Sequence, residues 1–279
     1  MRKYILPGMS LLILVILLTA FKNPGNNDTP IIKKKFSQAE MFKYRVFLGF
    51  FGNAGEATIV LNPGVHDYNG QSCYKAEVYG KSSGLWSAFF RIRDNWGAYF
   101  DTTTLLPVKS YRNIEEGKYR KYESVDYHQD KKSLVLKNFK EPTHENQKME
   151  LEQEVPFEVY DLVSGAFYLR ALDYDQMQKG DTLNVKGYLD KETFSFNIIF
   201  DGRTTVKTRI GKFKAFKLTP IMPDNKLFKG ENAISVWISD DINKVPLKVK
   251  AEMFVGSVGI EITEFQFGNQ VPNGIVNND

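Results

Sequence analysis

Residues 42–61 read FKYRVFLGFFGNAGEATIVL, and this stretch decides the fold class. Apolar side chains stand at every second position from Phe42 to Phe50, which predicts a strand with one buried face. Gly52 and Asn53 give a turn signal, and apolar residues return over 57–61 as a second strand. The folded part of the chain is therefore predicted to begin with a β-hairpin.

The same period of two continues through most of the chain, and most of the turns carry Gly, Asn or Asp. The further predicted strands cover 74–79, 89–93, 96–100, 108–114, 119–127, 133–139, 182–189, 193–200, 204–210, 213–218, 233–238, 246–254 and 258–267. This pattern predicts a mainly β fold, with one large antiparallel curved sheet or a half-open barrel whose edges are closed or covered.

One segment has the apolar spacing of a helix instead. Its apolar residues stand at offsets 0, 3, 4, 7 and 8 from Val159, and Pro156 precedes them. A helix is predicted over 159–171, packed against the open side of the curved sheet. Arg170 lies on the same apolar stripe, so we expect a buried stem with a paired charged head.

The first 20 residues have the layout of a secretory signal peptide. A basic start at 2–3 is followed by an uninterrupted apolar run at 11–18 and by small residues at 19–20. The apolar core over 9–21 is shorter than the roughly 20 residues that span a bilayer, so cleavage near Ala20 is favoured over an uncleaved anchor. We therefore expect an exported protein of the periplasm or cell envelope, with no stable transmembrane helix after cleavage.

Composition argues against several classes of function. Loss of Arg2 and Lys3 with the leader lowers the formal net charge from +4 to +2, and acids and bases are interspersed, so no nucleic-acid partner is expected. The single cysteine, Cys73, is far from the leader, so the protein is not expected to be a lipoprotein. The three histidines have no His or Cys at ligand spacing, and no nucleophile elbow or phosphate-binding glycine loop occurs. We predict no catalytic residue, no metal site and no cofactor, and we interpret Asp240-Asp241 as a capped turn.

Three segments are expected after the leader: a flexible linker over 21–40, a β-rich domain over 41–268 and a disordered tail over 269–279. Within the domain, a shift of 139 residues aligns turn-setting positions of two regions. The aligned pairs are Ala76 with Ala215, Phe89 with Phe228, Asp101 with Asp240, Pro107 with Pro246, Lys109 with Lys248 and Gly117 with Gly256. An internal duplication would give halves of about 41–140 and 181–268, joined by the predicted helix. The alternative is two ordinary hairpins of one sheet.

The most suggestive region for function is LWSAFFRIRDNW at 85–96, which holds two Trp and two Phe in twelve residues. One strand face cannot hold all of these rings, so some of them must face a second layer or a ligand. Ligand pockets are commonly lined by such rings with a few polar groups. The candidate ligand-binding residues are Trp86, Phe89, Phe90 and Trp96 for an apolar group, and Arg91 and Arg93 for an anionic head group. The alternative is packing of these rings beneath a loop.

Four segments carry a resemblance to a known family: FFRIRD at 89–94, DLVSGAFYLR at 161–170, GDT at 180–182, and WISDD at 237–241 with the following Val-Pro at 245–246. They resemble the family of exported bacterial proteins called domain of unknown function 3108, over most of the mature chain. That family carries no established activity, so the resemblance implies no catalytic residues. The Asp-to-Pro corner is also similar to strand ends of periplasmic lipoprotein carriers. This second likeness implies a curved antiparallel sheet, capped by helices, around an apolar cavity for acyl chains.

These observations predict an exported, non-enzymatic envelope protein that binds a hydrophobic or amphipathic ligand, such as a lipid or an acyl chain, in a cavity of the sheet. The alternative prediction is a scaffold or binding module for envelope polysaccharide or for a protein partner.

Overall fold

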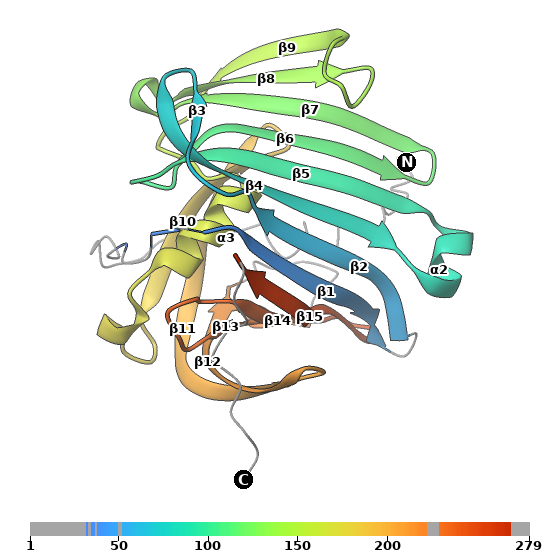
Figure 1. The fold of residues 1–279 in the computed structure, drawn as a ribbon, viewed down its shortest axis with the longest axis vertical. Coiled ribbons are helices and arrows are strands. Elements are labelled where there is room, and N and C mark those ends of the chain that lie inside the picture. Colours follow the sequence, from blue (N-terminus) through green and yellow to red (C-terminus); the bar gives the residue numbers. More distant parts are fainter. Residues whose placement is uncertain (1–31, 33–34, 37, 50–51, 222–228, 269–279) are drawn as a thin grey trace.

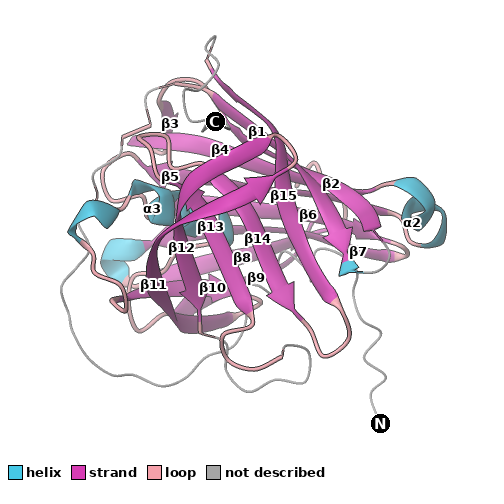
Figure 2. Ribbon diagram, turned by 90° about the horizontal axis from the view of Figure 1, so that it is seen from below, coloured by secondary structure: helices cyan, strands magenta, loops and turns pink. Residues whose placement is uncertain are grey.

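The computed structural model describes residues 32, 35–36, 38–49, 52–221 and 229–268. The predicted signal peptide and the predicted C-terminal tail lie outside these residues. Most of the described backbone is strand, and α2 and α3 lie well apart (Figure 2). The strands are β1 (Glu40–Leu48), β2 (Gly52–Leu61), β3 (His66–Tyr68), β4 (Gln71–Ser82), β5 (Ile92–Asp101), β6 (Pro107–Glu116), β7 (Tyr119–His128), β8 (Ser133–Phe139), β9 (Gln147–Glu154), β10 (Thr182–Leu189), β11 (Glu192–Thr208), β12 (Gly211–Pro220), β13 (Ile234–Ser239), β14 (Pro246–Glu252) and β15 (Ser257–Phe267). The α-helices are α2 (Gly84–Phe89) and α3 (Leu162–Ala171).

The strands form one antiparallel sheet that follows the chain closely. Its order is β10-β11-β12-β13-β14-β15-β1-β2-β4-β5-β6-β7-β8-β9, with β3 paired to β4 beside this path. Two runs of consecutive strands are thus joined where the first strand, β1, pairs with the last, β15. The sheet curls strongly (Figure 1). Its two end strands meet, since the Tyr188 hydroxyl of β10 donates a hydrogen bond to Gln153 of β9. The predicted mainly β fold with a curved sheet is confirmed.

Helix α3 lies inside the curl (Figure 1). On one side Val163, Phe167 and Ala171 pack against buried side chains of β2, β4 and β5. On the other side Tyr168 packs against the apolar residues of β10, β11 and β12. The helix predicted from the apolar spacing is therefore present, and it fills the concave side of the sheet.

Helix α3 begins three residues after the predicted start. Asp161 is its N-cap: the carboxylate accepts hydrogen bonds from the amides of Val163 and Ser164, and Ser164 Oγ accepts one from the Asp161 amide. The residue before the cap, Tyr160, is extended and forms a parallel bridge with Gly187 of β10. The first predicted turn is therefore replaced by backbone pairing to the sheet.

Arg170, near the end of α3, is buried and paired, as the apolar stripe predicted. Only 2% of its surface is exposed. Its Nη2 lies 2.6 Å from a carboxylate oxygen of Glu40 in β1. The guanidinium also donates to the backbone oxygens of Asn243 and Lys244 in the β13–β14 turn. One side chain thereby connects α3 to the strand and to the turn.

The end of the predicted linker is partly packed into this core. Ile32 forms an isolated bridge with Leu172, and Phe36 is buried beside the rings of Tyr74 and Phe167, with centroids 5.6 and 5.1 Å away. These contacts place the chain just before β1 against α3.

Several predicted boundaries differ from the structure. Helix α2 occupies the stretch just before β5, where a strand over 89–93 was predicted. Strand β11 continues through 201–202, where a turn was predicted, because the extra residue there forms a bulge against β12. Gly52 and Asn53, predicted as a turn, already belong to β2. Strands β3 and β9 were not predicted, and the exposed β9 has no apolar alternation.

Candidate functional site

The six predicted ligand-binding residues divide into three groups in the structure. Trp86 and Phe90 are half-buried and pack on the core cluster that contains Ile92. Phe89, Arg91 and Arg93 are exposed. Trp96 packs with the clusters around α3, on the strand face opposite to Arg93. The structure therefore brings Phe89 and Arg91 together at α2, and it separates Trp96 from them.

Helix α2 is short, and its own residues contribute little to fixing it on the sheet. The helix has no buried residue, and its N-cap, Ser83, makes no side-chain capping hydrogen bond. It is fixed at its two ends instead, where the Ser83 amide donates to Ala54 O and Phe90 covers Gly117 in the β6–β7 turn. Among its own apolar side chains, Trp86 packs on the core cluster, whereas Leu85 and Phe89 face solvent.

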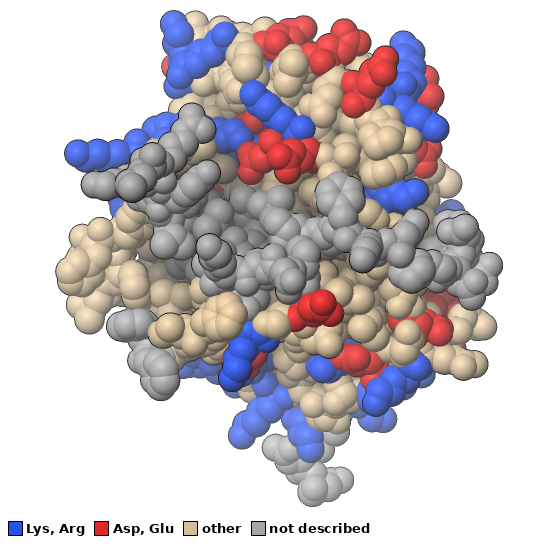
Figure 3. Space-filling view, turned by 180° about the vertical axis from the view of Figure 1, so that it is seen from behind, with Lys and Arg blue, Asp and Glu red and all other residues tan. Residues whose placement is uncertain are grey.

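Three neighbouring connections at this end of the sheet carry exposed apolar side chains. We call this surface the α2 rim. Its apolar members are Leu85 and Phe89 in α2 (83% and 85% exposed), Tyr119 after the β6–β7 turn (50%), and Phe254 and Val255 in the β14–β15 turn (65% and 88%). Its basic members are the exposed Arg91, Arg93, Lys118 and Arg120. Lys and Arg side chains project from this end beside a bulge without charge, at the left of Figure 3.

Only Phe89, Arg91 and Arg93 of the α2 rim were predicted from the sequence. Leu85 was inside the aromatic stretch but not selected, and the other members were missed. A usable signal was present, since Tyr119, Phe254 and Val255 each stand within two residues of a turn glycine. Large apolar residues at a turn are seldom needed by a core, because connecting segments run over the surface.

Beneath the rim, two carboxyl groups are buried side by side on the inner face of the sheet. Asp94 and Glu116 are 5% and 1% exposed, and Asp94 accepts a hydrogen bond from the amide of Glu115. Burial and the neighbouring charge of Glu116 raise the pKa of Asp94 well above its usual range. The pair therefore retains a proton at pH values where an exposed carboxyl group is ionised.

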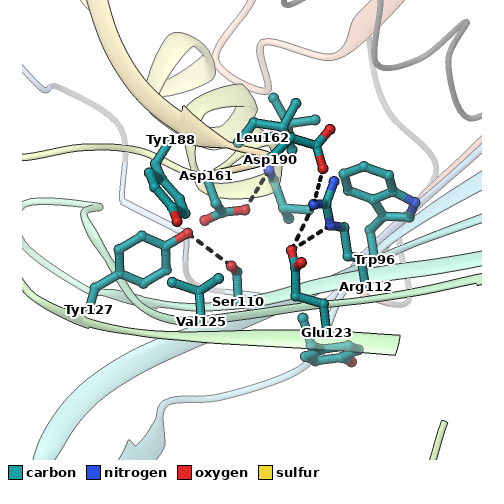
Figure 4. A pocket seen from close by; sticks show the side chains of 13 residues that line it. Trp96, Ser110, Arg112, Glu123, Val125, Tyr127, Asp161, Leu162, Tyr188 and Asp190 are labelled. Atoms are coloured by element: carbon teal, nitrogen blue, oxygen red, sulfur yellow. Dashed lines mark hydrogen bonds and ion pairs between the residues drawn. The ribbon is translucent and has the colours of Figure 1, made fainter. Parts of the chain in front are cut away.

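A small polar pocket lies at the seam where β10 approaches β6 and β7 (Figure 4). Arg112 pairs with Glu123 at 2.7 Å and with Asp190 at 2.5 Å, and Lys121 also contacts Asp190. Burial opposes ionisation of Asp190, yet Arg112 and Lys121 hold its pKa below the usual range. The pocket measures about 30 Å³, which is room for about two waters. Its charged side chains pair with one another and connect the end of β10 to β6 and β7.

A larger open cleft, of about 630 Å³, lies between the end of α3 and the β13–β14 turn. Its acids include Asp175 and Asp240, and Arg203 forms salt bridges with both of them. The second acid of the predicted capped turn, Asp241, accepts from the amides of Asn243 and Lys244. Within the described part of the chain, no group of three or more His, Cys, Asp or Glu residues is placed to hold a metal ion.

The outer face of β3 to β6 carries a row of tyrosines. Tyr68 and Tyr99 have ring centroids 5.0 Å apart, with Lys109 5.3 Å above the first ring. The Tyr111 ring lies over Gly97, and its hydroxyl donates to Glu77. This face offers flat aromatic surface bordered by charged groups. No described helix is both long enough and apolar enough for a bilayer crossing.

Comparisons with known proteins bear on the fold. A family model described as a protein of unknown function, DUF3108, matches residues 43–263. A crystal structure of a β-barrel-like protein of the domain of unknown function DUF1849 from Brucella abortus is similar, with a TM-score of 0.53 and 9% sequence identity. The match covers 84% of this chain and 99% of that chain. At this identity the likeness concerns the fold alone. No curated protein matches the chain.

Proposed function

We propose that this chain, which belongs to the DUF3108 family of proteins of unknown function, is an exported, non-enzymatic envelope protein that binds an amphipathic lipid. The family match confirms the resemblance found in the sequence. The binding site in this proposal is the α2 rim. The predicted export signal supports the location, because it would bring the folded domain to the compartment where envelope lipids are exposed.

The observation that carries the proposal is the exposure of Leu85 and Phe89 directly beside Arg91. Leaving two large apolar side chains in water forgoes about 1.5–3 kcal/mol for each one. A lipid would cover them with its acyl chain while its anionic head group met the guanidinium. Apolar contact and charge pairing are thus available to one ligand at one place.

We place the lipid at the rim rather than in the interior of the curved sheet, where the sequence suggested a cavity. Phe167 of α3 is buried between Phe36 and Phe100, with ring centroids 5.1 and 5.2 Å away. On its other side α3 packs toward Phe216 of β12, on whose ring Tyr174, from the segment after α3, is stacked. These side chains occupy the space in which an acyl chain would have to lie.

Binding of a soluble, short-chain phosphatidylglycerol, measured below its micelle concentration, tests the proposal. We expect saturable binding to the mature protein and a loss of at least about tenfold in affinity for the double variant Leu85→Ser/Phe89→Ser. The matched control is Val65→Ser/Ile242→Ser, which removes two apolar side chains exposed at the opposite end of the sheet. Absence of binding, or equal losses in both variants, would contradict it. Recovery of a mature N-terminus near Ala20 from the periplasm tests export.

A second candidate function is a binding module for envelope polysaccharide, and the tyrosine row on the outer sheet face favours it. Sugar rings stack on flat aromatic faces, and Glu77, Lys75 and Lys109 could bond hydroxyl groups beside Tyr99. Binding to a glycan array that is lost in Tyr99→Ala, with the α2 rim variant unaffected, would support this candidate instead of the lipid.

A further inference from the structure

We infer that the α2 rim docks the protein on the surface of an anionic lipid bilayer, with several turns inserted together. This inference rests on the proposed lipid-binding function and names the form in which the lipid is met. It differs from uptake of a single lipid, because the exposed apolar side chains of the rim come from three connections of the sheet.

The connections that form the rim lie next to one another along this end of the sheet. Gly49, just after β1, packs against the backbone of Ser257, so the end of β1 lies beside the β14–β15 turn. The next connection along the sheet is α2, joined to β2 by a hydrogen bond from Asn53 to Ser83. The amide of Gly117 in the β6–β7 turn donates to Arg91 O at 2.8 Å. A bilayer surface that touches one of these connections can therefore reach the others.

The charges of the rim select an anionic surface. Arg91, Arg93 and Lys118 are exposed and form no salt bridge with the described residues. Of the acids nearby, Glu56 lies 3.0 Å from Lys81 and Glu252 lies 2.5 Å from Lys250. Glu115, opposite Arg93 in the register of β5 and β6, accepts a hydrogen bond from the Tyr122 hydroxyl and is a single acid beside the three cations. The available charge at this end is therefore positive, and juxtamembrane cations are attracted to anionic head groups.

The opposite end of the sheet carries charges of both signs. Its corners carry Asp101, Asp240 and Asp241, and the cleft beside α3 adds Asp173 and Asp175. Arg203 forms salt bridges with Asp175 and Asp240, and Lys35 and Lys244 line the same cleft. The excess of positive charge therefore lies at the rim, and an anionic surface would attract that end more strongly.

Co-sedimentation with vesicles tests the inference on the mature protein. We expect binding to vesicles of phosphatidylcholine mixed with phosphatidylglycerol, and little binding to phosphatidylcholine alone. Binding should fall steeply at ~1 M salt, where the Debye length is about 3 Å. The charge variant Arg91→Gln/Lys118→Gln should bind at least about tenfold more weakly. Its matched control is Lys131→Gln/Lys207→Gln, which removes two exposed lysines away from the rim. Arg120 is left intact because it donates to two backbone oxygens of its own turn.

The depth of insertion is read from Trp86 in α2. In the variant Trp96→Phe/Trp237→Phe, brominated acyl chains should quench the remaining tryptophan. In Trp86→Phe/Trp96→Phe, the remaining Trp237 in β13 should stay unquenched. Quenching of Trp237 alone would place a different surface on the bilayer and overturn the assignment of the rim.

The vesicle result and the single-lipid result separate the two proposals. Binding of the short-chain lipid without binding to anionic vesicles overturns bilayer docking and leaves the lipid-binding function standing. Binding to vesicles without binding of the short-chain lipid supports docking and overturns the capture of individual lipids. Absence of both, or equal loss in the rim variants and their controls, overturns both.

Discussion

At the scale of single residues, Arg170 shows how a buried charge can be retained in an apolar core. Its guanidinium carbon lies 5.1 Å from the ring centroid of Phe36 and 4.9 Å from those of Phe42 and Phe167. The carboxylate of Glu40 supplies the opposite charge at 2.6 Å. A buried cation needs this combination of pairing and ring contact, because its removal from water is costly.

Replacement of Arg170 is expected to destabilise the fold. We predict that Arg170→Met lowers the free energy of unfolding by about 3–5 kcal/mol, because it removes one partner of a buried ion pair. The control is Arg203→Met, which removes an arginine whose salt bridges with Asp175 and Asp240 are half-exposed. There we expect about 0–1 kcal/mol. Urea unfolding of both variants measures the difference, and equal losses would contradict the structural role of Arg170.

The N-cap of α3 gives a prediction about pH. Burial raises the pKa of Asp161 to about 6, although its hydrogen bonds at the cap act in the opposite direction. In the unfolded chain the pKa is about 3.9, so between these values the folded protein binds more protons. Its free energy of unfolding therefore falls as pH rises from ~4 to ~6 through this group.

The variant Asp161→Asn keeps a side-chain oxygen that can cap the helix, but it removes the group that ionises. Relative to the wild type, its free energy of unfolding should rise by on the order of 2 kcal/mol between pH 4 and pH 7. Other buried acids, such as Asp94, are common to both proteins and cancel in the difference. Urea unfolding at several pH values measures this slope. A difference that is constant with pH would mean that Asp161 ionises normally in the folded protein.

The acids at the turns show where residue-level prediction succeeds. Asp101 was expected to hold a corner, and its carboxylate accepts hydrogen bonds from the amides of Thr103 and Thr104. At the second corner Asp241 has this role, and the aligned residue Asp240 pairs with Arg203 instead. The sequence does not show which of two adjacent acids caps the turn. That depends on a partner from a distant strand, here Arg203.

At the scale of elements, close strand packing depends on one glycine of β15. A side chain at Gly259 would meet the backbone oxygen of Val249 in β14 and would lie 2.7 Å from the ring of Phe47 in β1. The oxygen belongs to the backbone of a paired strand and cannot move far without disturbing the sheet. We predict that Gly259→Ala lowers the free energy of unfolding by roughly 1–3 kcal/mol.

The matched control for that change is Gly80→Ala in β4. Gly80 is also a strand residue, but nothing lies within 4 Å of the position that its Cβ would take. This change should be neutral or stabilising by about 0.5 kcal/mol, because alanine restricts the unfolded chain. Thermal unfolding of both variants decides the case. A loss at Gly80 as large as that at Gly259 would point to strand propensity rather than close packing.

Two of the elements that were missed from the sequence, α2 and β9, share a physical reason. Periodicity reports burial of one face, and neither α2 nor β9 buries a face. Helix α2 has no buried residue, and β9 is a mostly exposed edge strand that carries Glu150, Glu152 and Glu154. Such charges protect an edge from pairing with other chains. The elements that pack on the core, α3 among them, were predicted because the spacing of their apolar residues shows which face is buried.

At the scale of the whole molecule, the internal echo corresponds to matching elements. The shift of 139 residues relates β5, β6 and β7 to β13, β14 and β15. Pro107 opens β6 as Pro246 opens β14, and the turn glycines Gly117 and Gly256 both have positive φ, of 53° and 77°. Duplication remains a hypothesis. The sequence could not reveal how the two regions meet, because the pairing of β1 with β15 joins residues more than 200 positions apart.

That pairing leads to a prediction about cooperativity. If the two regions were independent modules, they would unfold separately. In the structure they share a continuous sheet, and α3 contributes to the apolar clusters of both. We therefore predict a single unfolding transition, since loss of either half would expose the faces of α3 and the edges of β1 and β15.

The three tryptophans make this measurable. Trp86 and Trp96 lie in the first region, and Trp237 lies in the second. Trp237→Phe leaves reporters for the first region, and Trp86→Phe/Trp96→Phe leaves a reporter for the second. In each variant, the urea midpoint from fluorescence should equal the midpoint from far-ultraviolet circular dichroism, with the same slope. A fluorescence midpoint that departs from the circular dichroism midpoint in opposite directions in the two variants would show that the halves unfold one after the other. The joint between β1 and β15 would then be a contact between two domains rather than the middle of one sheet.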